Sequence, residues 1–170
     1  MLEGAIVRLR VAQRSDIPAL ARIRAAPEVY RWWRGGTDLR AAVEQDLAED
    51  GIHPYVITLD DDAVVGWIQW QEETEPDYRH ASIDVYLDPA VRGRGLGPDA
   101  VATLARHLVG DHGHHRITID PAADNEAAIR AYTKVGFRPV GITRRSERGP
   151  DGTWHDGLLM DLLAEELPEV

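Results

Sequence analysis

The sequence predicts a mixed α/β (α+β) fold, a single layer of β-sheet with helices on both sides. Segments of alternating apolar and polar residues, typical of half-buried strands, are interspersed with segments whose apolar residues recur at helical spacing. A glycine-rich stretch, Arg92–Gly97, joins one strand-like segment to a helix-like one. The length of 170 residues fits one domain over residues 1–170, without an internal repeat or linker.

The N-terminal elements come first in this prediction. They are a strand at 6–11, a helix from Ser15 to about Arg24, a short segment containing Trp32 and Trp33 that ends at Gly35-Gly36, and a helix at 38–49. Ser15 is expected to cap the first helix, because a serine side chain accepts a hydrogen bond from an unpaired N–H of the first turn. Pro18 is tolerated there because the first turn does not need its N–H.

The rest of the chain alternates strands and helices. The expected elements are strands at 55–59, 64–70 and 81–87, a helix at 98–108, a strand at 115–120, a helix at 125–135, and strands at 137–143 and 158–163. Asp60–Asp62 is turn-like and predicts a hairpin between the first two of these strands. Gly136 is expected to close the helix before it. An excursion, 147–157, joins the last two strands.

Composition excludes several classes of function. The net charge of −10 argues against general nucleic-acid binding and is compatible with a cationic ligand. The absence of cysteine excludes disulfides, thiolate metal sites and an acyl-cysteine intermediate. No apolar run is long enough for a membrane span, and the first residues lack the pattern of a signal peptide. We expect a cytoplasmic protein with no nucleic-acid or membrane partner.

The glycine-rich loop is predicted to bind phosphate groups. Gly93, Gly95 and Gly97 leave the backbone unencumbered, so that successive N–H groups can turn toward one anion. The helix that follows contributes the positive end of its dipole, and Arg92 and Arg94 add positive charge. A local anion site in an acidic chain indicates a phosphate-bearing cofactor. The alternative is an ordinary strand-to-helix turn with two solvated arginines.

The order of these motifs is similar to that of a known superfamily. A strand, the loop Arg92-x-x-Gly95-x-Gly97 and a helix precede a further strand, an asparagine-started helix and Tyr132-x-x-x-Gly136-Phe137. This segment resembles the GCN5-related N-acetyltransferase (GNAT) superfamily. The resemblance implies a central mixed, mostly antiparallel sheet with two splayed parallel strands, flanked by helices.

Shorter motifs resemble the aminoglycoside 6′-N-acetyltransferases more closely. They are Trp32-Trp33-Arg34-Gly35-Gly36, residues 70–76, Ile83-Asp84, Asp120-Pro121, Asn125, residues 128–132, and Pro150-Asp151-Gly152. The resemblance implies transfer of an acetyl group from acetyl-CoA to an amine of a small polycationic aminoglycoside, and hence antibiotic resistance. The chain departs from the best-known enzymes at Arg34, and at Val85 and Tyr86 after Asp84, which puts the range of drugs in doubt but not the reaction.

Two aspartates are candidates for the chemistry of an amine acceptor. An ammonium group must lose a proton before or during attack on a thioester, and a carboxylate in the cleft can accept it. Asp84 lies on the polar face of its strand beside the glycine loop and is the expected base. Asp120 ends the next strand and is expected to bind an amine, although Asp-Pro is also a common turn.

Further site residues are carried over from the resemblance. Tyr132 is expected to protonate the departing thiolate, and Asn125 to bond the pantetheine arm as well as cap its helix. The expected cofactor-binding set is Tyr86, Leu87, Arg92, Gly93, Arg94, Gly95, Leu96, Gly97, Asn125 and Tyr132. The expected substrate-binding set is Trp32, Trp33, Trp70, Glu72, Glu73, Asp84, Asp120 and Asp151. For each tryptophan taken alone, a place in the core is the alternative.

The histidines and serines are given lesser roles. His112, His114 and His115 lack metal-ligand spacing and are expected to form a solvated turn, so no metal site is predicted. His80 and His155 are alternative bases. Ser82 and Ser146 lack the strand-turn-helix setting of an activated nucleophile, which favours direct transfer in a ternary complex.

Two other functions remain open from the sequence. One is acetylation of another amine, such as a protein N-terminus, a lysine or a siderophore hydroxylamine. The other is a non-catalytic module that binds acyl-CoA or sequesters a drug. The sequence leaves open which aminoglycosides are accepted and whether the chain is a monomer or a homodimer.

Overall fold

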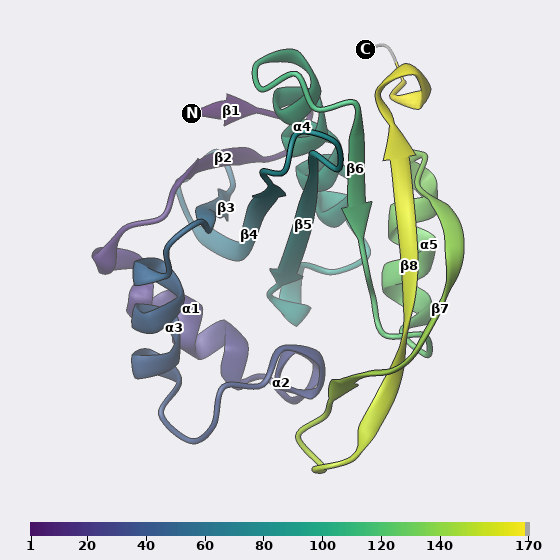
Figure 1. The fold of residues 1–170 in the computed structure, drawn as a ribbon. Coiled ribbons are helices and arrows are strands. Elements are labelled where there is room, and N and C mark those ends of the chain that lie inside the picture. The colour runs from purple at the N-terminus through teal and green to yellow at the C-terminus, as the bar shows by residue number, and fades with distance from the viewer. Residues whose placement is uncertain (169–170) are drawn as a thin grey trace.

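The computed structural model describes residues 1–168. The strands are β1 Leu2–Glu3, β2 Arg8–Val11, β3 His53–Thr58, β4 Val64–Glu73, β5 His80–Leu87, β6 Arg116–Ile119, β7 Arg138–Arg148 and β8 Trp154–Leu163. They form one eight-stranded sheet in the order β1-β2-β3-β4-β5-β6-β8-β7 (Figure 1). Neighbouring strands are antiparallel except β5 and β6, which are parallel. The predicted mixed, mostly antiparallel sheet is therefore confirmed.

Helices cover both faces of this sheet. They are α1 Ile17–Ala25, α2 Pro27–Trp33, α3 Leu39–Ala48, α4 Leu96–Gly110 and α5 Glu126–Val135. Short 3-10 turns lie at Arg14–Asp16, Pro89–Val91 and Ala164–Glu166. Within residues 1–168, none of the helices has the length and apolar composition that crossing a bilayer requires.

Two hydrophobic clusters hold the helices on opposite faces. Leu104 and Leu108 of α4 pack with Ile83 of β5 in the larger cluster, which also takes in Val135 of α5. Leu20 of α1 belongs to the smaller cluster, on the face from which Trp67 and Tyr86 project. Because side chains alternate along a strand, the side chain of Asp84 lies on the same face of the sheet as that of Tyr86, and the side chain of Ile83 lies on the other face. The polar face predicted for this strand is thus the face turned toward α1–α3.

Local sequence explains most element ends, with two exceptions. Asn125 accepts a hydrogen bond from the N–H of Ala128, and Gly136 closes α5 at a φ of 117°, as predicted. Ser15 does not cap α1, because it lies inside the 3-10 turn that precedes the helix and Asp16 takes the N-cap position.

The second exception is the expected excursion 147–157. In the structure β7 and β8 continue into it as a long hairpin, with Arg148 paired to Trp154. The sequence concealed this extension because nearly every residue of β7 is exposed, so its strand lacks an alternating apolar pattern.

Candidate active site

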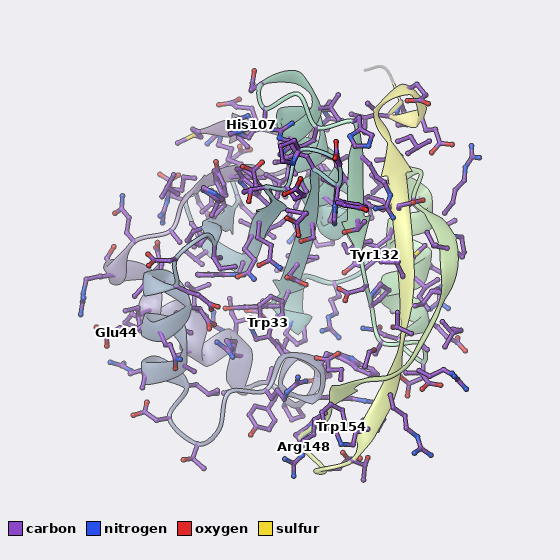
Figure 2. All side chains as sticks on the ribbon, in the orientation of Figure 1. Trp33, Glu44, His107, Tyr132, Arg148 and Trp154 are labelled. Carbon is purple, nitrogen blue, oxygen red and sulfur yellow. The ribbon has the colours of Figure 1, made fainter. Side chains whose placement is uncertain are left out.

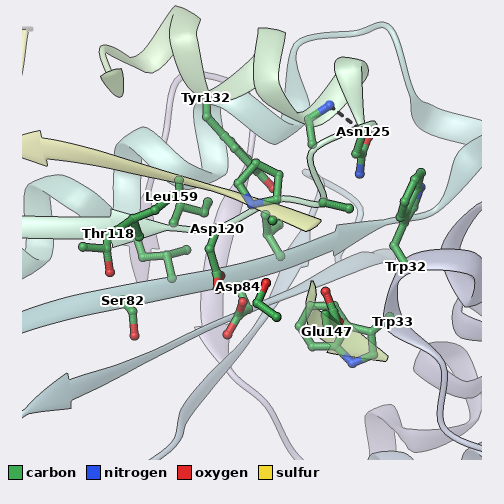
Figure 3. Close-up of a pocket in the computed structure, with 18 of the residues that line it drawn as sticks. Trp32, Trp33, Ser82, Asp84, Thr118, Asp120, Asn125, Tyr132, Glu147 and Leu159 are labelled. Atoms are coloured by element: carbon green, nitrogen blue, oxygen red, sulfur yellow. Dashed lines mark hydrogen bonds between the residues drawn. The ribbon is translucent and has the colours of Figure 1, made fainter. Parts of the chain in front are cut away.

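The parallel strands β5 and β6 separate at the centre of the molecule. They pair only at Ala81–Ile117 and Ser82–Thr118, while β5 continues to Leu87. Past that last pair each strand presents an aspartate, Asp84 and Asp120, on the same side of the sheet. Figure 3 shows both carboxylates pointing into one space beside the separating strands. The predicted splay of two parallel strands is present.

This space is an acidic cavity of about 580 Å³. We call it the acceptor cavity. Its acidic lining residues are Asp84, Asp120 and Glu147, and Trp32 and Trp33 also line it. They come from β5, the end of β6, β7 and α2, which are distant in the sequence. The cavity therefore gathers negative charge and aromatic surface that suit a cationic, ring-containing ligand.

Asp84 is the most perturbed carboxyl group of the cavity. Burial, and next the negative charge of Asp120, raise its pKa to about 6, with a smaller contribution from Glu147. The amide of Gln69 opposes this shift by donating from Nε2 to Asp84 Oδ2 at 3.3 Å. Trp67 Nε1 in turn donates to Gln69 Oε1 at 2.9 Å, which fixes the amide orientation. Asp84 is thus still ionised at neutral pH, yet basic enough to accept a proton.

Asp120 and Glu147 complete the negative lining. Asp120 keeps contact with solvent, but the cavity walls desolvate it enough to raise its pKa, and the charge of Glu147 adds to this rise. Glu147 Oε1 lies 2.6 Å from Nη1 of Arg34, at the C-terminal end of α2. Within residues 1–168, Asp84 and Asp120 have no such cationic partner, so both carboxylates are available to a cationic group that enters the cavity.

Tyr132 connects this cavity with a second one. Its buried side chain extends from α5 into the acceptor cavity (Figure 3), and it also lines the second cavity. Burial raises the pKa of Tyr132, and the charges of Asp84 and Asp120 raise it further, so the phenol stays protonated. Asn125 lines both cavities as well as capping α5.

The second cavity, of about 350 Å³, runs along the glycine loop. We call it the cofactor groove. Gly93 and Gly95 have φ values of 78° and 80°, which side-chain-bearing residues rarely adopt. Gly95 is also the N-cap of α4, so the first N–H groups of this helix face the groove with the positive end of its dipole. The backbone there fits a phosphate-bearing group such as the diphosphate of acetyl-CoA.

Most of the predicted cofactor residues line this groove. They are Tyr86, Leu87, Arg92, Gly93, Gly95, Leu96, Gly97, Asn125 and Tyr132. Arg94 is outside the lining of either cavity. Tyr86 is largely buried against Trp33 and Trp67, with ring centroids 4.8 and 6.4 Å away, so packing accounts for most of its surface. Arg92 Nη2 donates to the backbone oxygen of Glu28 at 3.3 Å and so ties the loop to α2.

Three predicted substrate residues lie elsewhere. Trp70 and Glu72 pair with Ile83 and Ala81 of β5. Paired residues share a face of the sheet, and Ile83 and Ala81 lie on the face opposite to that of Asp84, so Trp70 and Glu72 also lie there. Trp70 is buried and stacks on His53, with centroids 4.0 Å apart. Glu73 shares the face of Asp84 but ends β4 beyond the cavity lining. The structure thus places these three residues away from the acceptor cavity.

The predicted solvated turn of histidines is partly wrong. His114 is buried, with Nε2 3.2 Å from Glu72, and burial lowers its pKa. His112 packs edge-on against Trp70, and His115 is exposed. His107, which joins this group, lies near the top of the molecule in Figure 2, above the level of Trp33 and Tyr132. Among residues 1–168 no cluster of three or more His, Cys, Asp or Glu side chains is arranged to hold a metal ion.

Asp151 lies in a third cavity, of about 230 Å³, beside the acceptor cavity. The two share Trp32, Arg34 and Glu147 in their linings. Hydrogen bonds, first from the backbone N–H of Thr153 and then from His155, lower the pKa of Asp151 to about 2. Asp151 is therefore an ionised, exposed carboxylate one cavity away from Asp84.

Sequence reasoning missed several lining residues. Gln71, Ser82 and Thr118 line the acceptor cavity, and Gln69 bonds Asp84. The alternation of β4 and β5 contains the signal for Gln69 and Gln71, because both fall on the face of Asp84. The alternation does not predict the face of Glu147, because the register of β7 shifts between Thr143 and Glu147.

Comparisons with known proteins agree with this geometry. The acetyltransferase (GNAT) domain family matches residues 7–138. Mycothiol acetyltransferase of Nocardia farcinica is 30% identical over 147 residues, which are 82% of this chain and 47% of that protein. The N-alpha-acetyltransferase RimI of Mycobacterium tuberculosis is 30% identical over 109 residues, 64% of this chain and 66% of RimI. The chain thus spans about half the length of the first of these relatives and two-thirds of the second.

A solved structure extends the comparison to the ligands. Aminoglycoside acetyltransferase AAC(6')-Ib in complex with coenzyme A superposes with a TM-score of 0.78 at 27% identity, over 94% of this chain and 96% of that one. A further AAC(6')-Ib structure, 26% identical with a TM-score of 0.77 over 95% of each chain, holds paromomycin and acetyl-CoA. These complexes support acetyl-CoA as the cosubstrate predicted from the sequence. The chain belongs to the GNAT acetyltransferase family.

Proposed function

We propose that the chain transfers an acetyl group from acetyl-CoA to the 6′-amine of an aminoglycoside, by direct transfer in a ternary complex. The observation that carries this proposal is the acceptor cavity, where Asp84, Asp120 and Glu147 line one space that meets the cofactor groove at Tyr132. Several carboxylates around one cavity suit a compact polycation. The likeness to AAC(6')-Ib, whose structures contain aminoglycosides, supports the same acceptor class.

The cofactor groove would hold the cosubstrate through backbone groups. The N–H groups from Gly93 to Gly97 bind its diphosphate, and Asn125 bonds the pantetheine arm. Bound acetyl-CoA supplies an activated acetyl group as a thioester. Arg94 contributes long-range positive charge to this end of the groove from outside its lining.

Asp84 acts as the general base for the acceptor amine. Its carboxylate binds the incoming ammonium group and accepts a proton at Oδ1 or Oδ2, directly or through water. A pKa of about 6 leaves Asp84 mostly ionised at pH 7 and close to the value at which proton acceptance is efficient. Tyr132 holds a proton at Oη for the departing sulfur, and its raised pKa keeps that proton in place until it is needed.

The remaining carboxylates hold further amines. Asp120, whose negative charge acts on Asp84 more strongly than that of Glu147, would bind a second ammonium group of the same ring system. Asp151, in the adjoining cavity, is suited to an ammonium group on a more distant ring. Trp32 and Trp33 provide apolar surface for the sugar rings.

The test is an acceptor panel with each product analysed by NMR. The release of CoA thiol is measured with kanamycin, with a lysine peptide, with a peptide that has a free N-terminus, and without acceptor. We expect rapid release only with kanamycin and an acetyl group on its 6′ nitrogen. Acetylation at another nitrogen, or turnover with a peptide alone, would overturn the proposal.

A peptide N-terminus is the second candidate acceptor. It is favoured by the 30% identity to RimI, an N-alpha-acetyltransferase, over 64% of this chain. Such an acceptor presents one α-amine, for which Asp84 alone suffices, and leaves Asp120 and Glu147 without a role. The peptide arm of the panel decides between the two candidates.

A further inference from the structure

A guanidinium group stands among the carboxylates of the acceptor cavity. Arg34 Nη1 lies 2.6 Å from Glu147 Oε1. Both residues line the acceptor cavity and also the smaller cavity that holds Asp151. The ion pair therefore forms part of the partition between the two cavities.

This ion pair contributes little to the stability of the fold. The side chains of Arg34 and Glu147 are 38% and 44% exposed, so water competes for both charges. The buried Arg24 anchors the same backbone instead, because its Nη2 donates to the backbone oxygens of Trp33 and Arg34. The Arg34 side chain is thus free to leave Glu147 while its backbone stays in place.

The backbone at Arg34 is unfavourable for an arginine. Its φ is 40° at a ψ of −156°, a combination that glycine adopts far more readily than other residues. Glycines occupy the next two positions, Gly35 and Gly36, so the strain falls on the one residue of this turn that carries a charge into the cavity. Backbone strain of this kind is concentrated at active sites and ligand clamps.

We propose that Arg34 determines acceptor specificity by occupying, at Glu147, the place that an additional ammonium group of the acceptor takes. This inference rests on the proposed function, an amine acceptor in the acidic cavity. An acceptor with one amine engages Asp84 and leaves the Arg34–Glu147 pair intact. An acceptor with several amines must displace the guanidinium, which frees Glu147 and opens the way to Asp151.

The variant Arg34→Gly tests this without threatening the fold, because glycine suits the backbone angles at this position. We expect the KM for kanamycin to fall about three- to tenfold with kcat unchanged, since a competing cation has been removed. The KM for an aminohexose with a single primary amine should change less than twofold. Arg40→Ala is the matched control, because it removes one positive charge from an exposed position on α3 outside the cavity linings.

A double variant distinguishes displacement of the Arg34 guanidinium from a general change in the charge of the cavity. In a Glu147→Gln background the site that Arg34 occupies is no longer charged, so Arg34→Gly should bring no further gain for kanamycin. An unchanged or higher KM for kanamycin in Arg34→Gly, an equal fall for both acceptors, or an undiminished gain in the Glu147→Gln background would overturn the inference.

Calorimetric titration of kanamycin into the wild type and the Arg34→Gly variant gives the same comparison without turnover. Binding that tightens about three- to tenfold supports the displacement, and unchanged binding contradicts it. Failure of the wild type to acetylate kanamycin would contradict the proposed function by itself. Turnover by the wild type with no effect of Arg34→Gly would remove only the role of Arg34.

Discussion

The cofactor groove and the acceptor cavity meet at Tyr132 but are built in different ways. The glycine loop of the groove consists of backbone from one contiguous stretch, Gly93–Gly97, whose φ angles require glycine at two positions. The acceptor cavity depends on side chains from α2, β5, β7 and the end of β6, brought together by the sheet order. The glycine loop is encoded locally, and the acceptor cavity only by the complete fold.

This difference teaches which substitutions each site tolerates. A backbone site is damaged when the chain can no longer adopt its angles, whatever the chemistry of the new side chain. A side-chain site is damaged when one functional group is lost, even though the fold remains intact. Variants of the two sites should therefore separate cofactor affinity from turnover.

The largest effect is expected for Asp84→Asn. The amide keeps the size of the side chain but cannot accept a proton, so kcat should fall about 10²- to 10⁴-fold. Acetyl-CoA affinity should stay within twofold, because Asp84 lies outside the lining of the cofactor groove. Steady-state release of CoA thiol and calorimetric titration of acetyl-CoA measure the two quantities.

Asp77→Asn is the control for this variant, since Asp77 is exposed in the β4–β5 turn. It should match the wild type in both measurements. Loss of acetyl-CoA binding with normal turnover at saturation would refute the assignment of Asp84 as the base.

The next largest effect is expected for Gly95→Ala. At a φ of 80° an alanine is strained, so the loop should leave its anion-binding conformation and acetyl-CoA affinity should fall about 10- to 100-fold. Turnover at saturating acetyl-CoA should stay within a few-fold. Gly110→Ala in α4 is the control, because an added Cβ meets no atom within 4 Å there and its φ is not positive. Equal affinities of the two variants would contradict the backbone role of the loop.

The same contrast explains what the sequence could predict. The strand–loop–helix unit around Gly95 was predictable, because every contribution to it is local in the chain. Asp84 and Asp120 were predictable as candidates, because Asp84 lies on the polar face of an alternating segment and Asp120 directly follows the next strand. The resemblance to a known family supplied Tyr132, whose burial on α5 by itself indicates only a core residue.

The structure departs from the sequence-based expectation where tertiary pairing decides the placement of a residue. Trp70 and Glu72 belong to a stretch that resembles a substrate motif, but the pairing register of β4 and β5 turns them to the other face of the sheet. The sequence pattern predicts a connection at Glu147, because the exposed residues of β7 lack an alternating pattern; a register shift in β7 also changes the direction of this side chain. The local sequence pattern contains neither the pairing register of β4 and β5 nor the register shift within β7.

A third prediction concerns pH. Asp84 must be ionised to accept a proton, so kcat/KM should fall about tenfold per pH unit below its pKa of about 6. Asp120→Asn removes a negative charge that raises this pKa, so the acid limb of the profile should move to lower pH. A pH series of kcat/KM for both proteins measures the shift. A limb that stays in place or moves to higher pH would show that Asp84 does not sense Asp120.

The smallest effect is expected for Glu72→Gln. This variant tests whether a carboxylate must lie in the acceptor cavity to attract the acceptor, or whether any negative charge of the protein suffices. Glu72 lies on the face opposite Asp84 and faces His114 and Arg79, at 3.2 and 3.4 Å. The KM for kanamycin should therefore change less than twofold, with a modest loss of stability in thermal unfolding. Glu147→Gln carries the same change of charge inside the acceptor cavity and should raise that KM more. Equal effects of the two variants would mean that the net charge of the protein, rather than the cavity, attracts the acceptor.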